Sequence, residues 1–160
     1  IIEIISNLKN GLRPFDKIHE FSSNPGIYAV GFTGNIFPFP AGEHIVNRDD
    51  IIYIGKTEKS QRSRDAETHF RSGRTGSSTL RRSLGAILRR QLNLRPIPRS
   101  YSEKRMRDYK FIEESEKKLT DWMVNNLSLS FVEILDGKRK LREIERSVIN
   151  DILPILNMYW

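Results

Sequence analysis

Apolar and polar positions along the chain alternate with two different periods, which divide the sequence into helices and strands. Helical spacing predicts helices over residues 1–12, 60–70, 79–94, 116–126 and 138–153. Runs rich in Ile, Val, Tyr and Phe predict strands over residues 27–32, 51–55 and 129–135. Segments rich in Gly, Pro and Ser predict loops at 33–50, 71–78 and 95–106. Ser78 or Thr79 is placed to cap the third helix, and Ser115 the fourth.

The order of these elements indicates an α+β fold. The two early strands are joined too briefly for a helical crossover, so we expect them to pair antiparallel. The pattern therefore predicts a small, mainly antiparallel three-stranded sheet flanked by helices. With 160 residues the chain has the size of one domain, which we place at 1–160 with an N-terminal helical segment at about 1–24.

Composition excludes several classes of protein. The chain has no cysteine, which excludes disulfide frameworks, thiolate zinc sites and cysteine nucleophiles. No apolar run approaches the ~20 residues of a membrane helix, so no membrane partner is expected. The opening IIEIISNLKNGL lacks a basic start and is interrupted by Glu3, so we do not interpret it as a signal peptide and expect a cytoplasmic protein.

Positive charge is concentrated in one segment. Residues 61–99 carry ten arginines and two acids, a net +8, while the whole chain carries +7. Guanidinium groups suit phosphate, so this segregation favours a nucleic-acid partner over a solvated basic face, without distinguishing DNA from RNA. The expected nucleic-acid contacts are Arg62, Arg71, Arg74, Arg81, Arg82, Arg89 and Arg90.

One carboxylate of the last helix lies on its apolar side. At about 100° per residue, Glu145 falls about 40° from Leu141, within the stripe formed by Ile144, Val148 and Ile152. An acid on this side must be paired, hydrogen-bonded, protonated or metal-bound. On the helical wheel alone, a salt bridge to an arginine and a functional role are equally compatible with this position.

Two tyrosines and a histidine complete the candidate residues. Tyr28 and Tyr53 each lie within a predicted strand, where core packing with a satisfied hydroxyl is the ordinary role. His69 alone is equally ordinary. Taken together and in order, however, these residues form a pattern.

That pattern resembles the GIY-YIG nuclease family. The first motif stands as Gly26-Ile27-Tyr28 and the second as Tyr53-Ile54-Gly55. Either motif alone is weak, but the family's later elements follow in order and in the expected strand and helix contexts. They are matched by Lys56, Arg64, His69, Glu145 and Asn157.

Three features depart from the family pattern. The motifs are separated by 24 residues, which indicates a loop insertion at about 33–50, near the site. Arg64 and His69 lie five residues apart rather than the usual four, so Arg62 remains an alternative to Arg64. A basic loop–helix segment at about 71–95 exceeds the minimal module.

The resemblance implies a metal-dependent endonuclease that hydrolyses phosphodiester bonds in DNA. It implies one Mg²⁺ or Mn²⁺ per active site, held mainly by Glu145 with water and phosphate oxygens. Arg64 would stabilise the transition state, and Tyr28 would act as base or relay with its pKa lowered by nearby cations such as Lys56.

The other family positions have supporting roles by the same resemblance. His69 would accept or pass the proton or orient Tyr28, Tyr53 would position water or phosphate, and Asn157 would support the site.

The biological role and the oligomeric state stay open: restriction or defence and repair are both compatible with the resemblance, as are a monomer and a homodimer. Double-stranded DNA is the expected partner, with RNA not excluded. The alternative is a non-catalytic binding module that uses the Arg-rich 62–99 patch.

Overall fold

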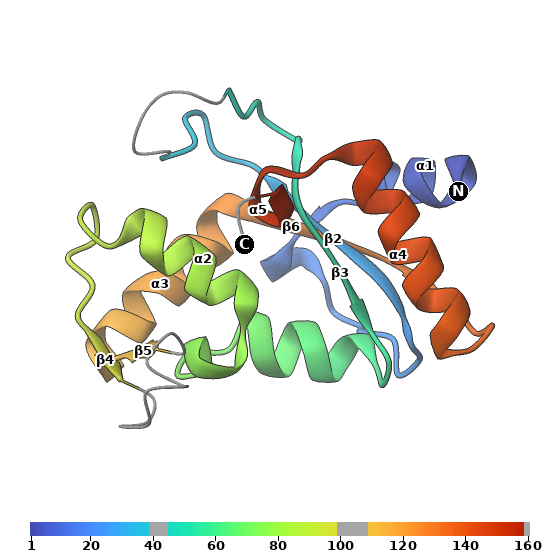
Figure 1. Ribbon diagram of the computed structural model, residues 1–160. Coiled ribbons are helices and arrows are strands. Elements are labelled where there is room, and N and C mark those ends of the chain that lie inside the picture. The colour runs from blue at the N-terminus through green and yellow to red at the C-terminus, as the bar shows by residue number, and fades with distance from the viewer. Residues whose placement is uncertain (39–44, 99–108, 159–160) are drawn as a thin grey trace.

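A computed structural model describes residues 1–38, 45–98 and 109–158 (Figure 1). Its centre is a four-stranded antiparallel sheet in the order β1–β6–β2–β3. The strands are β1 (Arg13–Pro14), β2 (Gly26–Phe32), β3 (Ile51–Thr57) and β6 (Leu127–Glu133). The α+β class and the three long strands are as predicted. The two-residue β1 was not predicted, because so short a strand leaves no period to detect.

Helices cover both faces of the sheet. They are α1 (Ile2–Asn10), α2 (Thr79–Leu88), α3 (Glu113–Asn126), α4 (Lys138–Ile152) and α5 (Ile155–Met158). A π-helix, η2 (Arg62–His69), and the two 3₁₀ turns η1 (Phe15–Lys17) and η3 (Thr75–Ser77) lie between them. Figure 1 shows α1 and α4 on one side of the sheet and η2, α2 and α3 on the other.

Alternation along the strands produces two hydrophobic cores. Tyr28 and Val30 of β2 face α2 and α3, where they join Leu84 and Leu119 in one buried cluster. Ile27 and Ala29, the intervening residues of β2, face α1 and α4 and pack with residues such as Leu141 and Val148. Because side chains alternate across a strand, consecutive residues of β2 serve opposite cores. The central β2 is consequently buried along its whole length.

Several element boundaries differ from the prediction. The segment expected as loop at 95–106 contains β4 (Pro96–Pro98), which pairs with β5 (Tyr109–Phe111) in a second sheet. Helix α3 begins at Glu113, and Ser115 does not cap it; its hydroxyl accepts the Arg95 amide instead. Ser78 does cap α2, since its Oγ accepts the N–H of Arg81.

The long loop after β2 lies at the end of the strands away from η2 (Figure 1). Its described parts dock through Phe37, which is buried, and through the Thr33 amide, which donates to the Asn126 carbonyl. Residues 39–44 of the loop lie outside the described residues, so the expected position of the insertion near the site stays a prediction. No helix in the described ranges is long and apolar enough to cross a membrane.

Candidate active site

The first motif places a tyrosine at the centre of the molecule. Tyr28 is 1% exposed, and its phenol oxygen lies 2.6 Å from Nε2 of His69. On the other side of the imidazole, Nδ1 of His69 lies 2.6 Å from Oγ of Ser78. Strand β2, the π-helix η2 and the N-terminus of α2 thus contribute Tyr28, His69 and Ser78 to one buried, hydrogen-bonded row.

The second motif supplies the space for this row. Gly55 is the register partner of Tyr28 in the antiparallel pair β2–β3. A Cβ at Gly55 would collide with the Tyr28 hydroxyl and the adjoining ring carbon. Overpacking of this kind forces side chains out of their rotamers, so glycine is needed for Tyr28 to reach His69.

The π-helix explains the unusual spacing of the arginine and the histidine. In η2 the Phe70 amide donates to the Asp65 carbonyl at 3.0 Å, a bond five residues back, and Thr68 Oγ1 donates to the Ser63 carbonyl at 2.8 Å. A π-turn therefore brings residues five apart onto one side. Arg64 and His69 share the face toward Tyr28, while Arg62 is exposed.

The pKa of Tyr28 is shifted in the direction opposite to that expected from the sequence. Burial raises the pKa of Tyr28 well above its ordinary value; Tyr53 and Asp65 raise it further, and Arg64 lowers it without reversing the shift. The expected lowering is therefore wrong for the protein alone. Lys56 does not contribute because it lies on the other face of the sheet, where β3 presents Ile54 to α4.

His69 is held neutral. Burial lowers the pKa of His69 well below its ordinary value, and the charges of Arg64, Arg81 and Arg82 lower it further. An imidazole with three guanidinium groups nearby is a poor acceptor for another proton.

Tyr53 connects the two faces of the site. Its ring lies 6.1 Å from the Tyr28 ring and 6.2 Å from the His69 ring, centre to centre. Burial raises the pKa of Tyr53, Arg64 lowers it, and Glu145 raises it. The hydroxyl is consequently within electrostatic range of both Arg64 and Glu145, which come from opposite sides of the sheet.

Glu145 lies on α4 beside the edge strand β3. It lines a cavity of about 340 Å³ with Lys56, Arg142, Arg146 and Ile149. Burial raises the pKa of Glu145, while Lys56 and Arg142 lower it. Within the described ranges no group hydrogen-bonds or ion-pairs its carboxylate, so the salt-bridge alternative finds no support there.

The cavity beside Glu145 offers one carboxylate, so it fits only a metal ion that takes few of its ligands from the protein. The described residues contain no group of three or more His, Asp or Glu side chains that could hold a metal. A half-buried carboxylate without a protein partner matches an ion bound by one residue and otherwise by water and phosphate oxygens, as Mg²⁺ commonly is.

Asn157 fixes the edge of β3. Its Oδ1 accepts the Ile54 amide at 2.8 Å, and its Nδ2 donates to the Ile54 carbonyl at 2.8 Å. Ile54 is the middle residue of the second motif. The chain reaches this position by turning at Leu153, which has a φ of 52°, after α4. The C-terminal segment therefore crosses the sheet edge between the two halves of the site.

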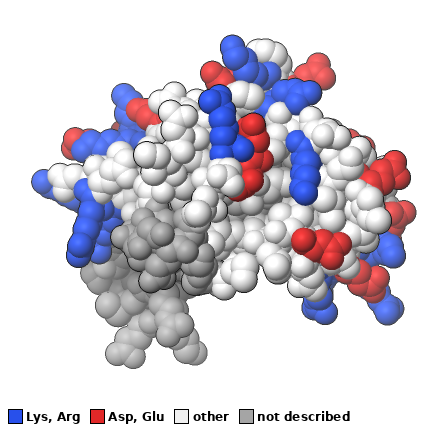
Figure 2. Space-filling model, turned by 90° about the horizontal axis from the view of Figure 1, so that it is seen from above, with Lys and Arg blue, Asp and Glu red and all other residues white. Residues whose placement is uncertain are grey.

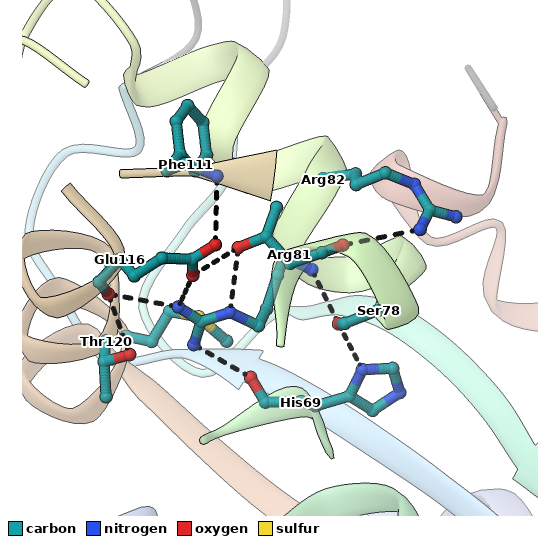
Figure 3. Close-up of polar contacts among 9 residues, drawn as sticks. His69, Ser78, Arg81, Arg82, Phe111, Glu116 and Thr120 are labelled. Atoms are coloured by element: carbon teal, nitrogen blue, oxygen red, sulfur yellow. Dashed lines mark hydrogen bonds and ion pairs between the residues drawn. The ribbon is translucent and has the colours of Figure 1, made fainter. Parts of the chain in front are cut away.

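Arg81 does not face solvent, so its predicted nucleic-acid contact is wrong. It is 0% exposed, and its guanidinium pairs with Glu116 at 2.8 Å (Figure 3). It also donates to Thr75 Oγ1 at 3.2 Å and to the His69 carbonyl at 3.2 Å. Since Arg81 lies three and seven residues before the buried Leu84 and Leu88, a helical wheel of α2 places it on the apolar side.

The other predicted arginines differ in exposure. Arg82 is half-buried and donates to the Gly76 carbonyl at 2.9 Å. The exposed members are Arg62, Arg71, Arg74, Arg89 and Arg90. Arg99, which also belongs to the basic segment, lies outside the described residues. On the face seen in Figure 2, described basic side chains are interspersed with acidic ones rather than gathered in a single block.

Sequence reasoning missed several groups around the site. Ser78 was assigned only a capping role, and Arg142 and Arg146 beside Glu145 were not considered. Asp65, in η2, is fully buried, and neither carboxylate oxygen has a hydrogen-bond partner among the described residues. Helical spacing from Glu145 reveals Arg142, three residues earlier, as a neighbour, but it does not reveal the adjacent Arg146, and no sequence signal places Ser78 against His69.

Comparison with protein families identifies the architecture. A family model of the GIY-YIG catalytic domain matches residues 34–159, a segment that begins after Tyr28 and includes Tyr53, Arg64 and Glu145. Comparisons with curated proteins and with solved structures give no match. Since the matched segment covers most of the chain, the protein belongs to the GIY-YIG family and carries the catalytic domain of a nuclease.

Proposed function

We propose that the protein is a divalent-metal-dependent endonuclease that hydrolyses phosphodiester bonds in DNA. The observation that carries this proposal is the pairing of two unlike half-sites across β3. On one side, the buried pair Tyr28 and His69 lies beside the half-buried Arg64. On the other, the Glu145 carboxylate lines a cavity with cations and has no protein partner among the described residues.

Arg64 and Lys56 are assigned to the phosphate. Arg64 acts on both tyrosines and also donates to the Ser77 carbonyl at 3.5 Å. Its guanidinium is placed to stabilise negative charge that develops in the transition state. Lys56 lines the Glu145 cavity and is half-buried, where its ammonium can contact a phosphate oxygen.

Glu145 is assigned to hold one Mg²⁺ or Mn²⁺. Such an ion, when bound, supplies positive charge to the phosphate and to the leaving oxygen. The cations beside Glu145 favour the additional presence of a phosphate, since Lys56, Arg142 and Arg146 would otherwise oppose a further positive charge.

Tyr28 is assigned to receive a proton at its phenol oxygen from the attacking water. Because burial raises the pKa of Tyr28, the phenolate is the minor form in the neutral range. We therefore expect the cleavage rate at saturating substrate to rise with pH from about 6 to 9. A single-turnover pH–rate profile measures this, and a flat profile would exclude Tyr28 as the base.

Cleavage of supercoiled plasmid tests the proposal. The protein is incubated with Mg²⁺ or with EDTA, beside Glu145→Ala and Glu143→Ala. Glu143 is an exposed residue of the same helix that pairs with Arg139, so it is a matched control. We expect nicked or linear product that needs metal, is retained in Glu143→Ala and is lost in Glu145→Ala. Full activity of Glu145→Ala or in EDTA would refute the metal assignment.

The same assay separates the alternative functions. Discrete fragments would support a restriction-type enzyme, whereas nicking or smearing would fit a repair or non-specific role. An RNA substrate run in parallel decides between the nucleic acids. Salt-dependent DNA binding without any cleavage would instead favour a binding module that uses the exposed arginines of the basic segment.

A further inference from the structure

Ser78 occupies an unusual position for a helix cap. Its Oγ accepts the Arg81 amide at 3.0 Å, the ordinary capping bond, and also lies 2.6 Å from Nδ1 of His69 (Figure 3). Ser78 and His69 are both 0% exposed, and Tyr28 is 1% exposed. The Ser78–His69 end of this row is therefore shielded from water, and its hydrogen bonds must be satisfied within the protein.

Counting donors and acceptors in this row selects one arrangement. A hydroxyl has a single proton to donate. If Nδ1–H of His69 donated to Ser78 Oγ, that oxygen would accept two N–H groups, and its own proton would have no acceptor among the described residues. If Ser78 Oγ–H donates to Nδ1 instead, the Arg81 amide, the Ser78 hydroxyl and both ring nitrogens are satisfied. The Tyr28 hydroxyl can then donate to the oxygen of Tyr53, its other side-chain hydrogen-bond partner.

We propose that Ser78 is a positioning residue that holds His69 as the Nε2–H tautomer, so that His69 donates a hydrogen bond to the Tyr28 oxygen. The inference rests on the proposed function for its catalytic meaning. It assigns His69 the role of stabilising the phenolate of Tyr28, rather than that of accepting its proton. The Tyr28 proton is then directed away from His69.

Two further contacts support a fixed imidazole. Arg81 donates to the His69 carbonyl at 3.2 Å, so the backbone of His69 and the hydroxyl of Ser78 are both held by the same residue. Burial and the charges of Arg64, Arg81 and Arg82 lower the pKa of His69, which disfavours the protonated ring that a proton acceptor must form.

The tautomer can be measured without any activity. Long-range ¹H–¹⁵N NMR on labelled protein reports which ring nitrogen carries the proton, and a His69→Gln variant assigns the signal among the three histidines. We expect Nε2 protonated and Nδ1 unprotonated. Protonation at Nδ1, or rapid averaging of the two tautomers, would overturn the proposal whether or not the protein cleaves DNA.

An isosteric pair of variants links the tautomer to catalysis. Asn and Asp both cap helices, but only the amide of Ser78→Asn can donate to Nδ1, whereas Ser78→Asp can only accept. We expect Ser78→Asn to keep the tautomer and most of kcat. Ser78→Asp is expected to protonate Nδ1 and lower kcat on the order of 10²–10⁴-fold, the scale seen when a catalytic histidine holds the wrong tautomer.

The outcomes are separable from failure of the proposed function. Equal kcat in the two variants, with cleavage intact, would overturn the proposal. If the wild-type protein shows the expected tautomer but cleaves nothing, the proposed function fails and the tautomer assignment stands. If Ser78→Asp does not fold, the wild-type spectrum and Ser78→Asn still decide.

Discussion

The two faces of the central sheet hold polar groups in different ways. On the face toward η2 and α2, the row Tyr28–His69–Ser78 and the pair Arg81–Glu116 are buried and hydrogen-bonded throughout. On the face toward α4, Glu58 pairs with Lys56, Lys138 and Arg142 in partly exposed ion pairs, and Glu145 has no partner among the described residues.

The contrast between the two faces matches two different roles proposed for residues of the candidate site. Under the proposed function, the groups whose geometry must be fixed before the reaction are the buried ones, since a buried hydrogen-bond network allows one arrangement. The groups proposed to exchange partners with an ion or a phosphate lie beside the Glu145 cavity, where partly exposed ion pairs cost little to rearrange.

The largest effect is expected from the buried ion pair. Arg81→Met removes one charge and leaves Glu116 buried and unpaired, which costs about 3–5 kcal/mol. Urea denaturation measures the free energy of unfolding. The double variant Arg81→Met/Glu116→Leu should recover much of the loss. A loss below about 1 kcal/mol in the single variant would show that the Arg81–Glu116 pair is not a buried, water-free pair.

Asp65 differs from the other buried polar groups on the face toward η2 and α2, because its carboxylate has no hydrogen-bond partner among the described residues. Burial raises the pKa of Asp65, so the folded protein binds this proton more tightly than the unfolded chain does. The stability of the wild type therefore rises as pH falls from the raised pKa toward the ordinary value near ~3.9. Asp65→Asn should accordingly stabilise the protein by about 1–3 kcal/mol at neutral pH.

Unfolding curves across pH test this assignment. The advantage of Asp65→Asn should shrink as the pH is lowered, whereas the exposed control Asp121→Asn should change stability little at any pH. A stabilisation that is independent of pH would mean that the Asp65 charge is not its cause.

A smaller loss is expected at the sheet edge. Asn157→Ala removes two hydrogen bonds to Ile54 and should cost about 1–2 kcal/mol. Amide exchange at Ile54 should accelerate, because its N–H loses the only acceptor recorded for it in the described structure. The exposed Asn125→Ala is a control; equal exchange at Ile54 in both variants would contradict the role of Asn157.

The smallest effect on stability is expected on the face toward α4, where the ion pairs are partly exposed. Arg142→Gln breaks a partly exposed pair with Glu58 at 3.5 Å and should change the free energy of unfolding by less than about 1 kcal/mol. If Arg142 contacts phosphate, the salt slope of DNA binding should fall by about 1. Binding curves at several salt concentrations measure it, and an unchanged slope would place Arg142 outside the DNA interface.

The sequence carried much of the fold because the long elements have clear periods. The runs around Tyr28 and Tyr53 became paired antiparallel strands, and Glu145, predicted within the apolar stripe of α4, is half-buried. The short strands β1 and β4 were not predicted because both contain proline, which is unusual inside a strand, and β1 also depends on β6, far along the chain. Charge alone misassigned Arg81, whose burial depends on Glu116, 35 residues away.

The sequence predicted which residues belong to the candidate site but not how they are arranged in space. The order of Tyr28, Arg64, His69 and Glu145 was readable, yet the five-residue step in η2 becomes intelligible only as a π-turn. The direction of the Tyr28 pKa depends on burial, which charge counting along the chain does not measure.

Asn157 also bears on how the protein behaves among its own copies. β3 is an edge strand, and an unpaired edge offers N–H and C=O groups to a strand of another molecule. At Ile54 both groups are already taken by a side chain of the same chain. The side-chain amide that fixes the second motif thus also occupies the hydrogen-bonding groups at the middle of this edge, where a strand of another molecule would otherwise pair.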